Sequence, residues 1–333
     1  MTGPAAEAAG PSAPPAPAAS SKAGRAEDIA GSHTNSAARA IAIVEFLASR
    51  PGQTFTLSDI ARRCGLRKST AYTILGTLHE AGWLTRSPAD LRYGLGPTLI
   101  TIGKMAEEAR PEVTLARPVM QALAVELQRE CVLSTAMGDE IVVLETTDIT
   151  GVRGRARQPG QRVPMVAPFG TVFVAWQDSP GRKEWYRRSA LAEPERIQEL
   201  EHILEATVRR GYVVTIKSDP HDRMNQVMNA VPDEATIQDV RRLLREQLSN
   251  LPPVEYLVSD ETPEHRYMVE TLQAPIFDAD HAPRYALTVN DIDRELDRDT
   301  VARLGARVRA AADQVTAAIS AHARQTWNPD APR

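Results

Sequence analysis

Residues 64–84, CGLRKSTAYTILGTLHEAGWL, combine a tight turn, a one-sided apolar helix and a glycine next to a tryptophan. The polar residues gather at the N-terminal end of the helix, where backbone N–H groups are unpaired and the helix dipole is positive. Such an end suits phosphate groups. The apolar residues recur at the spacing of a helix that packs along one stripe, and they are Ala71, Ile74, Leu75 and Leu78.

Two further helices precede this stretch and a hairpin follows it. Ser36 suits the cap of a helix whose apolar stripe, residues 40–47, stops at a Pro-Gly pair. Thr56 caps a second helix, which ends at Gly65. Residues 83–96, WLTRSPADLRYGLG, read as strand, turn and strand. Three short helices followed by a basic hairpin predict a winged helix-turn-helix.

Composition and charge narrow the class of protein. The 333 residues are enough for two ordinary domains. Their composition, 42% hydrophobic and 25% charged, is typical of a soluble globular protein. Apolar runs stay below the ~18 residues of a membrane span, and the N-terminus lacks a signal-peptide core, so we expect a cytoplasmic protein with no membrane partner. Residues 33–104 hold nine Lys or Arg against four Asp or Glu, which is +5 within a net charge of −4. This local excess is what phosphate binding needs.

The rest of the chain divides into a tail and a second domain. Residues 1–34 are dominated by Ala, Pro, Gly and Ser, which predicts a disordered tail. From about residue 117 helical and strand patterns alternate; CVLSTAM and EIVVLETT form a hairpin around residues 138–139, and a long helix covers 299–322. This half therefore predicts an α+β domain, an antiparallel sheet with helices on its faces.

At this point TLSDIARRCGLRKSTAYTILGTLHEAGWL, followed by RYGLG, resembles the DNA-binding domain of the IclR family of bacterial transcription regulators. In that family a Lys-Ser-Thr stretch opens the recognition helix. The likeness continues through PTLITIGKMAEEARP, GQRVPMVAPFGT, RGYV and QAPIFDADH. A segment near 222–262 looks like a helical insertion in the family pattern. The resemblance implies a winged helix-turn-helix at 35–96, a linker helix at 97–112, a GAF-like effector-binding domain at 113–324 and a flexible tail at 325–333.

The candidate DNA contacts lie on the third helix and the hairpin. The first turn of the helix is expected to hold phosphates, while the next residues reach base edges or the thymine methyl. Thr73 stands where the family often has arginine. The hairpin arginines would meet the minor groove or the backbone; the alternative for each residue is an ordinary solvated surface. The full set is Thr56, Arg67, Lys68, Ser69, Thr70, Tyr72, Thr73, Arg86 and Arg92.

The resemblance also implies a small-molecule site, with small carboxylates and aromatic acids as its effectors. Its side chains supply hydrogen bonds and no acid–base chemistry, which favours binding over turnover; ordinary sheet residues are the alternative. An arginine-rich run at 151–163 is a solvated hairpin or holds one arginine for an anionic metabolite. The expected effector contacts are Phe169, Gly170, Thr171, Gln273, Ala274, Thr288 and Asn290.

Two other functions compete with this interpretation. Asp219, His221 and Asp222, with His265 further on, could form the metal or acid–base site of an enzyme. No catalytic motif accompanies them, and the two cysteines, at 64 and 131, make no metal-ligand spacing, so neither a metal ion nor a cofactor is expected. The second alternative is a winged-helix regulator of the GntR type, which has a helical effector domain.

Assembly is the last expectation from the sequence. One recognition helix buries little surface, so two heads are expected on each operator. The linker helix carries an apolar side formed by Leu99, Ile102 and Met105 or Ala106, which suits a homodimer. The resemblance implies a dimer of dimers, hence a homotetramer. Whether the protein is a repressor or an activator stays open.

Overall fold

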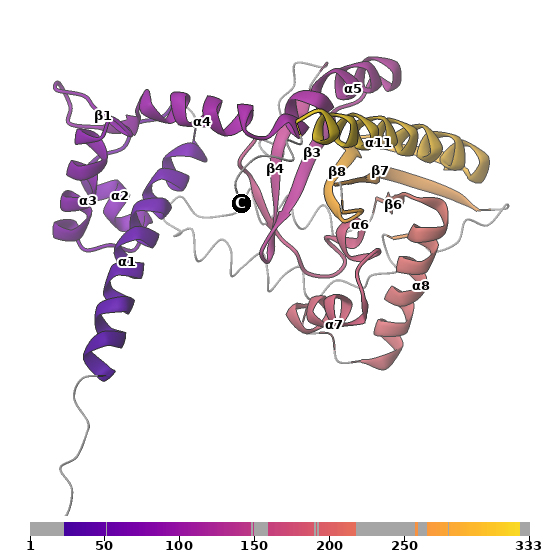
Figure 1. The fold of residues 1–333 in the computed structure, drawn as a ribbon, viewed down its shortest axis with the longest axis horizontal. Helices are drawn as coiled ribbons and strands as arrows, with labels where there is room; N and C mark the ends of the chain where they lie inside the picture. The colour runs from indigo at the N-terminus through magenta and orange to yellow at the C-terminus, as the bar shows by residue number, and fades with distance from the viewer. Residues whose placement is uncertain are drawn as a thin grey trace, which may run out of the picture.

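An N-terminal helical head and a second, sheet-containing domain are joined by a single helix (Figure 1). The architecture is α+β, as the sequence predicts. The computed structural model describes residues 23–50, 52–147, 149, 159–189, 191, 193–217, 257–258, 265–278 and 280–326.

The head consists of three helices around a small apolar core. Helix α1 spans Ala23–Ala48, α2 spans Leu57–Arg63 and α3 spans Lys68–Glu80. Their apolar stripes meet in one cluster, and burial of a large apolar side chain stabilises a fold by about 1.5–3 kcal/mol. The most buried members of this cluster are Ile43, Phe46, Leu47, Ile60, Leu75 and Leu84.

Helix α1 begins earlier than the sequence analysis expected. It starts at Ala23, so the last part of the predicted tail is helical and the predicted cap at Ser36 is wrong. Residues 23–34 contain no proline and include several alanines, the residue of highest helix propensity, so the helix extends from its packed end toward the N-terminus. Residues 1–22 lie outside the described residues.

The predicted hairpin forms the wing of the head. Strand β1 (Leu84–Arg86) pairs antiparallel with β2 (Tyr93–Leu95). Phe55, just before α2, makes a further bridge to Tyr93 in β2. The wing is therefore attached to the start of α2 as well as to the end of α3.

A single helix leads from the wing to the second domain. Helix α4 spans Thr98–Glu108, close to the predicted linker at 97–112, and none of its residues is buried. Its apolar side chains Ile100, Ile102 and Met105 are exposed. Helix α5 (Pro111–Leu127) follows at once and packs against the sheet.

The second domain is built on one seven-stranded sheet. The strand order is β5-β4-β3-β8-β7-β6, with β9 paired to β7, and every pair is antiparallel. The predicted hairpin is correct to the residue, whereas β9 is a strand that the sequence analysis did not predict. The strands are β3 (Cys131–Met137), β4 (Glu140–Thr147), β5 (Arg162–Pro164), β6 (Val213–Ile216), β7 (Arg266–Phe277), β8 (Pro283–Val289) and β9 (Arg294–Asp297).

Helices cover both faces of this sheet (Figure 1). One face, here called the helix-pair face, packs on α5 and α11 (Arg298–Thr326) and holds the larger core. The other face lies toward α6 (Thr171–Val174), α7 (Ser179–Arg188) and α8 (Pro194–Arg210) and holds a second core around Trp185. Alternate residues of each strand therefore serve two different cores.

Two segments discussed in the sequence analysis lie largely outside the described residues. The predicted insertion near 222–262 lies outside the described residues except for residues 257 and 258, and the arginine-rich run at 151–163 lies outside them up to residue 158.

Of the helices that the structure describes, none is long and apolar enough to cross a lipid bilayer.

Candidate nucleic-acid interface and effector site

Helix α2 begins with a capping box that fixes the approach to α3. The Asp59 backbone N–H donates to Thr56 Oγ1 at 3.2 Å, and the Thr56 hydroxyl donates to Asp59 Oδ2 at 2.7 Å. The hydrogen bond from Thr56 holds the pKa of the Asp59 carboxyl below its usual range. Thr56 is thus the expected cap, and its hydroxyl is engaged within the chain and not turned to a DNA phosphate.

The turn between α2 and α3 sets the direction of the recognition helix. Gly65 takes φ +63°, a conformation that glycine adopts without strain, and the Leu66 N–H donates to the Ala61 carbonyl at 2.7 Å. The next residue, Arg67, is the N-cap of α3 and gives no side-chain hydrogen bond to the first turn. The N-terminal end of α3 therefore carries the positive end of the helix dipole and has no side-chain cap.

The outward side of α3 carries the predicted contact residues. Arg67, Lys68 and Ser69 are exposed, and Tyr72 is 64% exposed although it is a large aromatic residue. Thr70 is only half-buried. The Thr73 hydroxyl donates to the Ser69 carbonyl at 3.2 Å, one turn back along the helix.

The two wing arginines have different surroundings. The Arg92 guanidinium donates to the Thr54 carbonyl oxygen from Nε at 3.1 Å and from Nη2 at 2.7 Å. Arg92 therefore clasps the wing to the segment before α2, and its hydrogen-bonding edge is not presented to a duplex. Arg86 instead lies over the Tyr93 ring, with Cζ 5.6 Å from the ring centroid, and stays exposed.

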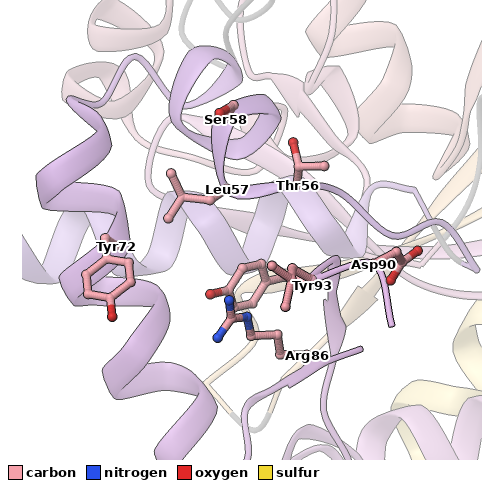
Figure 2. A pocket seen from close by; sticks show the side chains of 8 residues that line it. Thr56, Leu57, Ser58, Tyr72, Arg86, Asp90 and Tyr93 are labelled. Atoms are coloured by element: carbon pink, nitrogen blue, oxygen red, sulfur yellow. The ribbon is translucent and has the colours of Figure 1, made fainter. Parts of the chain in front are cut away.

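A pocket of about 280 Å³ opens between α2, α3 and the wing (Figure 2). Hydroxyl, aromatic, aliphatic and cationic side chains share its wall, and Asp90 is the one carboxylate among them. Ser87 holds the pKa of the Asp90 carboxyl below its usual range through a hydrogen bond, so Asp90 is ionised at neutral pH. The lining residues are Thr56, Leu57, Ser58, Tyr72, Arg86, Asp90, Leu91 and Tyr93.

The structure thus brings part of the predicted DNA set together. Thr56, Tyr72 and Arg86 meet at one pocket although they come from three elements, while Arg92 is drawn away by Thr54. Sequence analysis missed Ser58 and Leu91, which also line the pocket. Ser58 could have been found, since it is a polar residue in the first turn of a short helix whose stripe is already assigned to the core.

On the second domain, a row of polar side chains crosses the sheet face opposite the helix-pair face. Gln273 in β7 lies directly across from Thr288 in β8, and the Thr271 hydroxyl donates to Thr215 Oγ1 at 2.9 Å. Ser134 in β3 is buried on the same side, since it pairs with Ala286, two residues before Thr288 in β8. Ser134, Thr215 and Thr271 are buried and Gln273 and Thr288 half-buried, and hydroxyl and amide groups among apolar neighbours are typical of small-molecule sites. Ser134, Thr215 and Thr271 are members that sequence analysis missed.

Ala274 does not join this row, and the Asn290 side chain is engaged at the end of the strand. Ala274 points to the opposite face and is fully buried in the core against α5 and α11, because successive strand residues alternate in direction. Its assignment to the effector site is therefore corrected. Asn290 follows the end of β8, where its amide donates to Glu130 Oε2 at 3.4 Å.

The turn into α6 is held by its own contacts. The Thr171 hydroxyl donates to the Pro168 carbonyl at 2.6 Å, and the Trp185 indole donates to the Phe169 carbonyl at 3.0 Å. Gly170 has φ +90°, and a Cβ there would lie 2.5 Å from Met165 Cγ. This turn leads into α6, which packs on β7 and β8, so it lies near the polar row. Its own polar groups are engaged in the hydrogen bonds that hold the turn.

A family model covers most of the head, from the second half of α1 to β1. The IclR helix-turn-helix domain matches residues 36–88, the range that contains α2, α3 and the first strand of the wing. Residues 36–88 are therefore similar to an IclR-type helix-turn-helix domain.

Individual relatives agree with this assignment. The HTH-type transcriptional regulator KipR of Bacillus subtilis is 25% identical over 39% of this chain, and the match spans half of KipR. The transcriptional repressor IclR of Escherichia coli is 22% identical over 84% of this chain and 88% of its own length. Among solved structures, an IclR homolog from Microbacterium hydrocarbonoxydans, complexed with 4-hydroxybenzoate, shares the fold with a TM-score of 0.57 and 18% identity, covering 86% of this chain and 99% of that one.

With these similarities the two competing functions lose support. The relatives are transcription regulators and not enzymes. Asp219, His221 and Asp222 lie outside the described residues, and within the described part no three His, Cys, Asp or Glu side chains gather into a metal-binding group. A GntR-type helical effector domain is excluded by the seven-stranded sheet.

Proposed function

We propose that the chain is a cytoplasmic transcription regulator that binds operator DNA as a homodimer and responds to a small organic anion in its second domain. The observation that carries the DNA-binding part is the exposed, uncapped N-terminal end of α3, with Lys68 and Tyr72 outward, beside a pocket that the wing closes. A recognition helix and a wing of this kind enter adjacent grooves of a duplex.

Within this interface, phosphate contacts and base contacts are separable. Lys68 in the first turn carries a mobile ammonium group, which suits a phosphate. Tyr72 projects farther along the reading side and lines the pocket with Arg86, so it suits a base edge. Ser58 and Arg86 provide a hydroxyl and a cation on the opposite walls, where the sugar-phosphate strand between helix and wing would lie.

We therefore expect Lys68→Ala and Tyr72→Ala to weaken binding in different ways. Lys68→Ala should lower affinity for all duplexes and reduce the slope of log affinity against log salt by about one unit. Tyr72→Ala should reduce discrimination between operator and random DNA by ~1–3 kcal/mol and leave the slope unchanged. Fluorescence anisotropy over a salt series measures both.

The operator for this experiment comes from selection of bound fragments out of the source genome. Lys183→Ala, an exposed lysine on α7, is the matched control and should change neither quantity. Equal effects of the two head variants on operator and random DNA would refute the division of labour. Absence of any salt-sensitive binding by the wild type would refute the proposed function itself.

The effector site is proposed on the polar row of the sheet. Gln273 and Thr288 offer an amide and a hydroxyl side by side, and the 4-hydroxybenzoate bound by the Microbacterium homolog makes aromatic acids the first probes. Calorimetry with a panel of small carboxylates, including 4-hydroxybenzoate, should identify one that binds. Gln273→Ala should then weaken that acid roughly tenfold, the usual cost of losing one hydrogen bond in a buried site.

The control for the effector experiment is Gln198→Ala, the same substitution at an exposed position of α8. It should leave the affinity for the acid unchanged. An unaltered affinity of Gln273→Ala would move the site away from the polar row.

A further inference from the structure

A β-bulge in β4 turns one carboxylate to the unexpected face of the sheet. Ser134 lies opposite Val143, but the preceding residue, Leu133, lies opposite Glu145, so Leu144 is the extra residue of the bulge. In a regular strand Val143 and Glu145 would share a face. Because Leu133 belongs to the core of the helix-pair face, Glu145 emerges on that face, whereas Val143 stays with Ser134 on the polar-row side.

On the helix-pair face Glu145 meets an arginine of α5. Arg117 donates to Glu145 Oε2 from Nε at 3.0 Å and from Nη2 at 2.6 Å. The guanidinium is a planar fork whose donors keep a fixed geometry, so its direction follows the direction of the carboxylate. The bulge therefore decides where this guanidinium can point.

The same guanidinium also holds the last turn of the linker helix. Arg117 Nη2 lies 2.7 Å from Glu107 Oε1 in α4. The two carboxylates raise the pKa of Arg117 above its ordinary value, so this guanidinium is charged at neutral pH. Because α4 buries none of its own side chains, its direction relative to the sheet depends on the junction with α5 and on contacts of this kind.

Stability alone does not account for this arrangement. Glu107 and Arg117 side chains are each 40% exposed, and exposed ion pairs contribute little to folding. A bulge that interrupts the strand beside Ser134 is a costly way to make a surface pair, whereas bulges next to binding sites commonly re-aim a side chain. The contact among the three charged groups therefore supplies a fixed geometry and little net stabilisation.

We propose that Arg117 is a positioning residue that couples the bulge in β4, and hence the polar-row face of the sheet, to the direction of the linker helix. The inference rests on the proposed function, since it assigns the effector signal a route from that face to the DNA-binding heads. A ligand that shifts the paired residues Ser134 in β3 and Val143 in β4 moves Glu145 on the other face, and Arg117 carries the shift to Glu107. Two arrangements of α4 then differ in the distance between the heads of a dimer, which is the two-state element that such coupling needs.

Hydrogen exchange on the full chain tests the coupling without DNA or effector. Glu107→Gln should raise the exchange rates of β4 amides around the bulge about two- to fivefold, and Glu145→Gln should do the same in the last turn of α4. Glu108→Gln, the same change at the next residue of α4, is the control, because none of the contacts described joins Glu108 to Arg117. A change confined to the element that carries the substitution would overturn the proposal.

Binding to duplexes with two half-sites at varied spacing gives the second readout. Wild type and Glu108→Gln should prefer one spacing by roughly tenfold, while Glu107→Gln and Arg117→Lys should bind all spacings alike and keep wild-type affinity for a single half-site. Arg117→Lys keeps the charge but loses the fork, so a wild-type spacing preference in that variant would also overturn the proposal. If wild type binds no duplex, the proposed function fails, and hydrogen exchange still decides the coupling.

Discussion

Ile102→Asp in the linker helix is expected to lower operator affinity roughly 100-fold or more, because the second head of a dimer binds at a high effective concentration that a monomer lacks. Ile102 is 41% exposed and lies on one side of α4 with Leu99, Met105 and Ala106. An aspartate at the centre of a buried apolar contact would leave an unpaired charge there. Sedimentation velocity measures the loss of dimer, and anisotropy measures the loss of affinity.

The control uses the same chemistry on the other side of the helix. Ile100 is 64% exposed and, at 100° per residue, lies about 160° around α4 from Ile102. Ile100→Asp should therefore leave both the dimer and operator affinity close to wild type. Neither variant should change affinity for a single half-site. If both variants dissociate the dimer equally, the apolar side named here is not the contact.

Gly96→Ala is expected to destabilise the head by about 3 kcal/mol or more, through a clash between backbone segments that side-chain movement cannot relieve. Gly96 lies where the wing passes into α4, and its N–H donates to the Trp83 carbonyl at 2.7 Å. A Cβ at Gly96 would lie 2.7 Å from the Trp83 carbonyl carbon and 2.8 Å from the Leu84 nitrogen. Hydrogen exchange over residues 57–95 isolates this effect from the second domain.

Gly76→Ala is the matched control within the same head. No atom lies within 4 Å of a Cβ built at Gly76, which is in the interior of α3. There alanine is the better helix former, so the substitution should stabilise the head by about 0.5–1 kcal/mol. A similar loss of protection in both variants would mean that glycine is needed for some reason other than close approach.

The elements of the head could be predicted because their signals are local. The cap at Thr56, the glycine at 65 and the helical spacing in α3 each act within a few residues, and the structure has all three as expected. The contact between Arg92 and Thr54 joins residues far apart in the sequence, so no local pattern reveals that this guanidinium is engaged within the head.

The second domain shows the same division between local and distant information. EIVVLETT reads as one continuous strand, and nothing in its residues marks the bulge that places Glu145 on the helix-pair face. Gln273 and Ala274 are successive strand residues, so their side chains point to opposite faces of the sheet. The resemblance to the family segment nevertheless assigned both residues to one effector site. Which face of a strand meets a ligand depends on strand order and register, and these are set by pairing partners elsewhere in the chain.

The Thr73 hydroxyl donates to a carbonyl of its own helix, so the group that Thr73 can turn toward a duplex is its methyl. A methyl reads the C5-methyl of thymine by apolar contact, without a hydrogen bond. The same substituent on the same ring carbon is present in 5-methylcytosine. At that step of the operator, the proposed contact would respond to whether the pyrimidine is methylated and not to which base pair it belongs to.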